Sequence, residues 1–196
     1  MEVVLLGTGT ATPSLARNAS GIAVRCHGHT LLIDMGPGTL RRLCEAELDT
    51  KDVDAILITH FHPDHVSDLV PFLFASNYAY GPVREAPFYL VGDESLEQFY
   101  GALVAVYNGW IVPRGNRLLM RQLNQETPDF EDLPGVIVRS APSAHSVQGR
   151  AYRIDADGVS VTISGDTDVS DDIAALASGT DVFICECSMP EGRKIP

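Results

Sequence analysis

Short apolar runs, each bounded by Gly, Asn, Asp or another turn-forming residue, recur along the whole chain. Runs of this length with such boundaries are typical of strands. The predicted strands are residues 3–6, 21–25, 29–34, 54–59, 88–91, 117–123, 135–140, 149–155, 159–164 and 181–185. The Asp-Ala-Asp-Gly sequence at 155–158 separates two of these strands and predicts a hairpin turn.

Three longer segments favour helices. In residues 38–47, Leu40, Leu43 and Cys44 fall on one face at helical spacing. Residues 67–80 and 95–107 are also predicted to be helical. Ser67 and Asp68 are residue types that open helices. Strand meanders interrupted by helices predict an α/β fold in which helices cover sheets, rather than a simple βαβ array. Because no repeat, linker or internal boundary is visible, we expect residues 1–196 to form one domain.

Composition narrows the class of protein. Hydrophobic residues make up 45% of the chain, and no apolar run approaches the roughly 18 residues of a membrane span. Glu2 stands where a signal peptide would have basic residues. The four cysteines fit neither a disulfide framework nor a zinc finger, which favours free thiols in a reducing compartment. We therefore expect a cytoplasmic protein with no membrane partner.

The balance of acidic and basic residues indicates which kinds of partner the protein can bind. With 14 basic and 26 acidic residues, the net charge is -12. Such a chain repels a phosphate backbone at long range, and the sequence shows no Lys/Arg cluster. Nucleic acid is therefore an unlikely partner on charge alone.

Three of the six histidines fall within six consecutive residues, directly after the strand predicted at 54–59. His60 and His62 are two residues apart on an extended segment, so their side chains lie on the same side and can bind one metal ion. Asp64 and His65 follow a turn that Pro63 helps to fix, and they can bind a second ion. Imidazole and carboxylate together suit zinc, manganese or iron. The density of histidines disfavours a chance polar loop.

Two further candidate ligands follow predicted strands. His145 comes after the strand at 135–140, and Asp166 comes after the strand at 159–164, each among small residues that leave room for an ion. Taken alone, each signal is weak, since a histidine after a strand is more often a surface residue and Gly-Asp-Thr is commonly a turn. Their order and spacing after the His60 motif favour metal binding.

This ordered pattern resembles the ligand signature of the metallo-β-lactamase superfamily. The opening Leu-Gly-Thr-Gly-Thr-Ala-Thr-Pro at 6–13, Ser-Gly-Asp-Thr at 164–167 and Cys-Glu-Cys-Ser at 185–188 are similar to its ribonuclease Z-like branch, which also holds phosphodiesterases and some arylsulfatases. The resemblance spans nearly the whole chain. It implies an αββα sandwich, with two mixed sheets flanked by helices and the metal site at one edge between the sheets.

The resemblance also implies two divalent metal ions, with zinc expected and manganese or iron as alternatives. The implied ligands are His60, His62 and His145 for metal one, Asp64 and His65 for metal two, and Asp166 as the bridge between them. A water shared by two such ions becomes a hydroxide nucleophile near neutral pH. Asp64 is implied to orient that hydroxide and accept its proton. Asp34, after a strand, is interpreted either as a support for a metal histidine or as a helix or turn cap.

One feature departs from the family pattern. The pattern ends with a further metal histidine, usually soon after the Glu-Cys-Ser-like segment, and residues 188–196 contain none. His27 and His29 lie too early in the chain to match it. We therefore expect that the 1–196 domain lacks its C-terminal segment and that metal two is held weakly.

Several activities fit this site. The first hypothesis is hydrolysis of a phosphodiester of a small molecule. The alternatives are a tRNA 3′-end endonuclease, an arylsulfatase or lactonase-type esterase, a diiron redox protein, and a non-catalytic binding protein on the same fold. The tRNA enzymes typically carry a projecting basic arm between the positions of His145 and Asp166, and only 20 residues separate these two here. We therefore expect a small-molecule ester substrate and allow for a homodimer.

Overall fold

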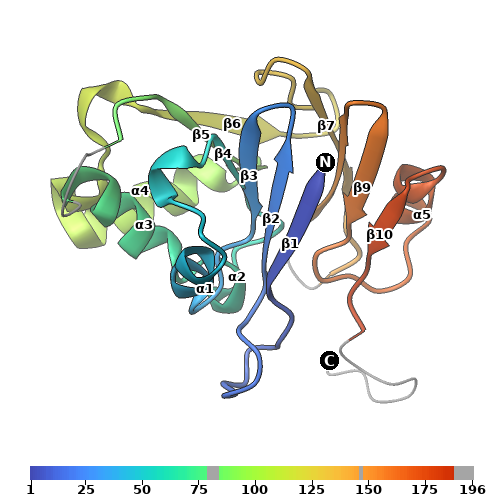
Figure 1. The fold of residues 1–196 in the computed structure, drawn as a ribbon, viewed down its shortest axis with the longest axis horizontal. Helices are drawn as coiled ribbons and strands as arrows, with labels where there is room; N and C mark the ends of the chain where they lie inside the picture. The colour runs from blue at the N-terminus through green and yellow to red at the C-terminus, as the bar shows by residue number, and fades with distance from the viewer. Residues whose placement is uncertain (79–83, 146–147, 188–196) are drawn as a thin grey trace.

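The computed structural model describes residues 1–78, 84–145 and 148–187. Two sheets face each other, and helices lie on their outer sides (Figure 1). The first sheet has the order β1 (Glu2–Gly7), β2 (Gly21–Cys26), β3 (His29–Ile33), β4 (Ala55–Leu57), β5 (Phe88–Asp93) and β6 (Leu118–Leu123). The second has the order β10 (Val182–Ile184), β9 (Val159–Ile163), β8 (Arg150–Ala156) and β7 (Val136–Pro142).

The helices are divided between the two outer faces. Figure 1 shows the first group on the side of the six-stranded sheet, namely α1 (Thr39–Glu45), α2 (Pro63–Val66), α3 (Leu69–Tyr78) and α4 (Leu96–Tyr107). Short 3-10 turns η1 (Thr50–Asp52), η2 (Asn108–Ile111) and η3 (Arg114–Asn116) connect elements on this side. Helix α5 (Asp171–Ala177) packs against β7 and β8 of the other sheet. The predicted αββα class is confirmed.

Both sheets are mixed, and their topology brings several loops to one edge. Strands β3, β4, β5 and β6 are mutually parallel, whereas β2 runs antiparallel to both of its neighbours, β1 and β3. In the second sheet, β7, β9 and β10 all run in the same direction. The loops that follow the carboxyl ends of parallel strands collect at the same edge of a sheet. The candidate residues all follow these ends, which is why segments far apart in the sequence can form one site.

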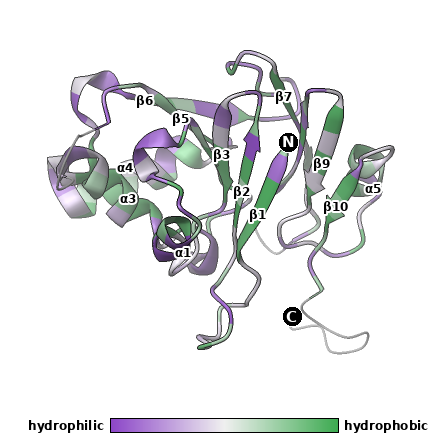
Figure 2. Ribbon diagram, viewed as in Figure 1, coloured by the Kyte–Doolittle hydropathy of each residue, from purple (hydrophilic) through white to green (hydrophobic). Residues whose placement is uncertain are grey.

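The apolar residues form one core layer between the sheets and a second beneath the helices. The inner layer joins β2, β3 and β4 to β7, β8 and β9. The outer layer joins the six-stranded sheet to α1, α3 and the first turn of α4. In Figure 2 green, hydrophobic stretches accordingly mark strands such as β1, β2 and β10. Tyr152 is fully buried in the inner layer, and its hydroxyl donates to the carbonyl of Ile58 at 2.6 Å. Burial raises the pKa of Tyr152, so it remains a neutral donor.

The element boundaries differ from prediction in a few places. Strand β4 ends at Leu57, two residues earlier than expected, and residues 79–80 of the predicted helix 67–80 lie outside the described ranges. Helices α2 and α5 were not predicted. Pro63 starts α2 at its first position, where a missing N–H costs nothing. Helix α5 begins at an N-capping Ser170 followed by two aspartates, a start signal that the sequence does contain.

The predicted hairpin at 155–158 is confirmed. Ala156 pairs directly with Val159, leaving a two-residue turn of Asp157 and Gly158. Both turn residues have positive φ, as a type I′ turn requires. Within the described ranges, no helix is long and apolar enough to cross a membrane.

Candidate metal centre

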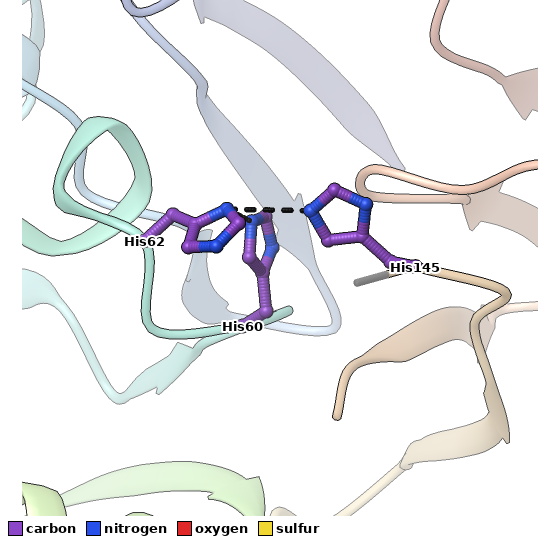
Figure 3. Close-up of side chains that lie close together, drawn as sticks. All are labelled: His60, His62 and His145. Carbon is purple, nitrogen blue, oxygen red and sulfur yellow. Dashed lines mark hydrogen bonds between the residues drawn. The ribbon is translucent and has the colours of Figure 1, made fainter. Parts of the chain in front are cut away.

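Three imidazoles converge where the loops after β4 and β7 meet. His60 Nε2 lies 3.0 Å from His62 Nδ1, and His145 Nε2 lies 3.3 Å from the same nitrogen. Figure 3 shows the His145 ring reaching across from its own loop toward the other two. The structure therefore brings together the three histidines that the sequence assigns to metal one.

Thr59 fixes which nitrogen of His60 faces this cluster. The Thr59 hydroxyl donates to Asp34 Oδ2 at 2.9 Å, so its oxygen is free to accept from His60 Nδ1, which lies 3.1 Å away. The Nδ1 proton thus points outward, and the Nε2 lone pair faces the other imidazoles. Burial, together with the nearby charge of His65, lowers the pKa of His60 to about 4. His60 is therefore neutral, as a metal ligand must be.

Asp34 orients His65 in the same way. His65 Nδ1 lies 2.6 Å from Asp34 Oδ2, which leaves His65 Nε2 facing Asp166 Oδ1 at 3.3 Å. Burial lowers the pKa of His65, but the two carboxylates outweigh this effect and raise that pKa to about 10. Asp34 is almost fully buried and also accepts from the backbone N–H of Thr59 at 2.8 Å. From the sequence, Asp34 is interpreted either as a support for a metal histidine or as a helix or turn cap. Its hydrogen bond to His65 matches the first interpretation.

The carboxylate of Asp166 lies between His65 and His145. Its Oδ1 faces His65, while its Oδ2 is 4.0 Å from His145 Nε2. Burial raises the pKa of Asp166, but the hydrogen bond to His65 and its charge outweigh burial and lower that pKa. One carboxylate oxygen thus faces His65 and the other faces His145, which is the arrangement that a ligand bridging two metal ions needs.

Asp64 differs from its expected place. Among the described residues, donor atoms gather in two sets, His60 with His62 and His145, and His60 with His65 and Asp166. Asp64 belongs to neither set. It stands in the first turn of α2, where its Oδ2 is 3.8 Å from His65 Nε2. His60 thus occupies the place in the second set that the sequence assigned to Asp64.

Hydrogen bonds between loops hold the His145 and Asp166 segments together. The Ala144 N–H donates to Thr167 Oγ1 at 3.1 Å, and the Asp168 N–H donates to the Ala144 carbonyl at 2.7 Å. Glu186 accepts from the Thr167 N–H at 2.6 Å. Sequence reasoning missed Thr59, Thr167 and Glu186 as supporting residues, and only their position next to a candidate ligand or in a family-like segment signals them.

The donor set fits a metal ion. Two of the histidines have one ring nitrogen engaged by an outer partner, so that the other nitrogen faces the cluster. The donor atoms of His60, His62 and His145 all lie within 4.8 Å of one another, and so do those of His60, His65 and Asp166. Imidazole nitrogens grouped in this way, with a carboxylate beside them, form a zinc-type ligand set.

Gly36 allows the loop after β3 to pack against α2. A Cβ atom at this position would lie 2.1 Å from the Asp64 carbonyl oxygen and 2.8 Å from that of Ser20. We expect Gly36→Ala to displace α2, to destabilise the fold by about 1–3 kcal/mol and to lower activity. Urea unfolding and turnover measure both effects.

Gly101→Ala is the matched control, because a Cβ atom there meets open space in the interior of α4. It should stabilise the protein by about 0.5–1 kcal/mol and leave activity unchanged. Wild-type stability and activity in Gly36→Ala would contradict the proposed packing.

The chain matches a known family and curated relatives. A family model described as Anti-Pycsar protein Apyc1 matches residues 1–99. Ribonuclease Z from Mycobacterium bovis (strain BCG / Pasteur 1173P2) is 30% identical over 199 residues, which cover 94% of this chain and 69% of that protein.

Solved structures show the same architecture. The metallo-β-lactamase fold protein YhfI from Bacillus subtilis aligns with a TM-score of 0.79 at 19% identity, over 98% of this chain and 73% of its own. The short form of human tRNase Z aligns with a TM-score of 0.75 at 26% identity, over 93% of this chain and 76% of its own.

The names of these relatives are relevant to the prediction, made from the net charge, that nucleic acid is an unlikely partner. Two of them are named for RNA, which makes the expectation that nucleic acid is an unlikely partner doubtful. The fold, the His/Asp cluster and the relatives agree on the larger grouping. The chain belongs to the metallo-β-lactamase superfamily of metal-dependent hydrolases, in its ribonuclease Z-like branch, and its residues 1–99 match the Apyc1 family within it.

Proposed function

We propose that this protein is a metal-dependent phosphodiesterase that acts on small molecules. In this proposal His60, His62 and His145 hold one divalent ion, with zinc as the expected metal. His65 and Asp64 hold a second ion, and Asp166 contacts both. The convergence of His60 Nε2 and His145 Nε2 on His62 Nδ1, each within hydrogen-bond distance of it, supports this assignment.

The ions, when bound, activate a water molecule as the nucleophile and stabilise negative charge on the substrate. Side chains around the candidate ligands orient the histidines and hold the loops of the site together. Asp34 and Thr59 engage Nδ1 of His65 and of His60, so that Nε2 of each ring is directed toward the candidate donor sets. The bonds among Ala144, Thr167 and Asp168 hold the His145 segment against the Asp166 segment.

Asp64 is the proposed proton acceptor. It lies beside the second donor set without belonging to it, and its side chain is partly exposed. A carboxylate in this place can accept a hydrogen bond from the attacking water and take its proton. Asp64 therefore combines a weak ligand role with a catalytic one in this proposal.

The β8–β9 hairpin is the observation that favours a small substrate. Between His145 and Asp166, the described residues 148–165 consist of β8, the two-residue turn, β9 and short connections. There is thus no projecting arm in this part of the described chain, where the tRNA enzymes typically carry one. The net charge of -12 acts in the same direction, because binding to a polyanion depends on neutralising its phosphates.

The tRNA 3′-end endonuclease is the second candidate, and the names of the relatives favour it. Its substrate also contains a phosphodiester bond, so the metal site alone does not separate the two. The arylsulfatase and lactonase-type esterase alternatives share the same nucleophile. Initial rates on an aryl sulfate and a lactone, compared with the rate on a phosphodiester, separate these two alternatives from the proposed activity.

We expect zinc-loaded protein to hydrolyse a bis-aryl phosphate and cyclic nucleotides, and to leave precursor tRNA uncut at physiological salt of about 0.15 M. Initial rates on these substrates, with an aryl sulfate and a lactone beside them, measure the preference. A chelator-treated sample is the control for metal dependence. Efficient cleavage of precursor tRNA at that salt concentration would contradict the proposed substrate class and support the second candidate.

A further inference from the structure

Within the described part of the chain, the ring of His62 has no outer partner of the kind that holds His60 and His65. His60 is held by Thr59, and His65 is held by Asp34. Among the hydrogen bonds between described residues, the His62 ring contacts only His60 and His145, both of them candidate ligands. The position of His62 must therefore be set mainly through its backbone.

That backbone is anchored by the residue between the two histidines. The Phe61 ring stacks on the Phe99 ring of α4, with centroids 4.4 Å apart and planes inclined by 24°. Both rings are partly buried against the outer core layer. A Cβ atom at Gly92 would lie 3.3 Å from Phe61 Cζ, so glycine at the end of β5 leaves the room in which the Phe61 ring lies.

From these contacts we propose that Phe99 is a positioning residue for metal one. It acts through Phe61, whose peptide bonds join directly to His60 and His62. This inference rests on the metal site of the proposed function and adds to it a residue on a helix that contributes no candidate ligand. A shift of the Phe61 backbone displaces both flanking ligands, and metal sites tolerate only small displacements of their donors.

The effect of removing the Phe61–Phe99 stack on metal binding can be measured separately from its effect on the stability of the fold. Within α4 only Leu96 is fully buried, and Phe99 lies at the partly exposed surface. Truncating Phe99 therefore removes a surface support without opening a cavity in the main core. An aromatic pair contributes beyond simple burial by an amount that corresponds to roughly a 2- to 12-fold change in an equilibrium.

The test compares Phe99→Ala with Phe74→Ala. Phe74 is also a surface aromatic in a stacked pair, with Tyr78 at 4.8 Å and 30°, but it belongs to the side of α3 that faces Trp110. Zinc affinity is measured by competition with a chelator, and urea unfolding is measured on the metal-free forms. We expect Phe99→Ala to weaken zinc binding about 3- to 10-fold, with kcat lowered at saturating zinc and KM unchanged. Phe74→Ala should bind zinc like the wild type.

A second variant acts on the same ring from the other side. Gly92→Ala should push Phe61 by a few tenths of an ångström and weaken zinc binding without removing any ring. Wild-type zinc affinity in both Phe99→Ala and Gly92→Ala would overturn the positioning role. An equal loss of affinity in Phe74→Ala would also overturn it, because the effect would then be general. If the wild-type chain itself bound no zinc, the metal site would fail, and the positioning role would fail with it.

Discussion

Replacing His145 with alanine is expected to remove the tightly bound metal ion and nearly all phosphodiester hydrolysis. His145 is the only member of the first donor set that comes from the second sheet, so its loss leaves two ligands on one short segment. Loss of an outer partner of a metal ligand typically costs about 10- to 100-fold in affinity or activity, and loss of a ligand should exceed that. Metal analysis of the purified variant and its turnover of a bis-aryl phosphate measure the effect.

His27→Ala is the control for this prediction. His27 lies in the turn between β2 and β3, at the opposite end of the strands from the candidate site, where its Nδ1 is 2.7 Å from Asp157 Oδ1. This pair is half exposed and should contribute little to stability. We expect His27→Ala to keep its metal and its activity. Retention of full metal content in His145→Ala would show that the three imidazoles do not form the site.

Asp34→Asn is the second variant with a large expected effect. The carboxylate accepts hydrogen bonds from His65, Thr59 and Ser20, and an amide oxygen with an NH₂ group in place of the second oxygen cannot accept them all. A buried donor left without a partner costs about 1–3 kcal/mol. We expect this loss in urea unfolding and a roughly 10- to 100-fold loss of metal affinity, because the His65 ring is no longer held with Nε2 toward the second donor set.

Asp54→Asn separates the two effects. Asp54 is another carboxylate beside a strand end, where it accepts from the Thr30 N–H at 3.0 Å, but it has no contact with the candidate ligands. It should lose some stability and keep its metal affinity. If Asp34→Asn lost stability to a similar extent and kept full metal affinity, Asp34 would be a structural residue only.

The sequence alone predicts those parts of this molecule that depend on local pattern. The strands are short apolar runs between turn residues, and all ten lie where expected within a few residues. The group from His60 to His65 is readable because its members are adjacent in the chain. The missed helices α2 and α5 are short, and apolar periodicity over so few residues is too weak to distinguish them from turns.

The supporting network could not be predicted in the same way. Asp34 is 14 residues from Ser20, 25 from Thr59 and 31 from His65, so only the fold brings these groups together. The place of Asp64 also depends on tertiary structure, since α2 turns its side chain beside the second donor set rather than into it. The stack of Phe61 on Phe99 is a contact of the same long-range kind.

Whether this protein is a metal-dependent hydrolase centred on His60, His62 and His145 is tested most directly by one titration. Metal-free protein is titrated with zinc while bound metal and hydrolysis of a bis-aryl phosphate are followed in the same samples. We expect no activity without metal, one tightly held ion per chain, and activity that appears as a second, weaker ion binds to His65, Asp64 and Asp166. Undiminished hydrolysis by the metal-free chain, or the absence of any tight zinc binding, would show that the three histidines are not the centre of a metal-dependent hydrolase.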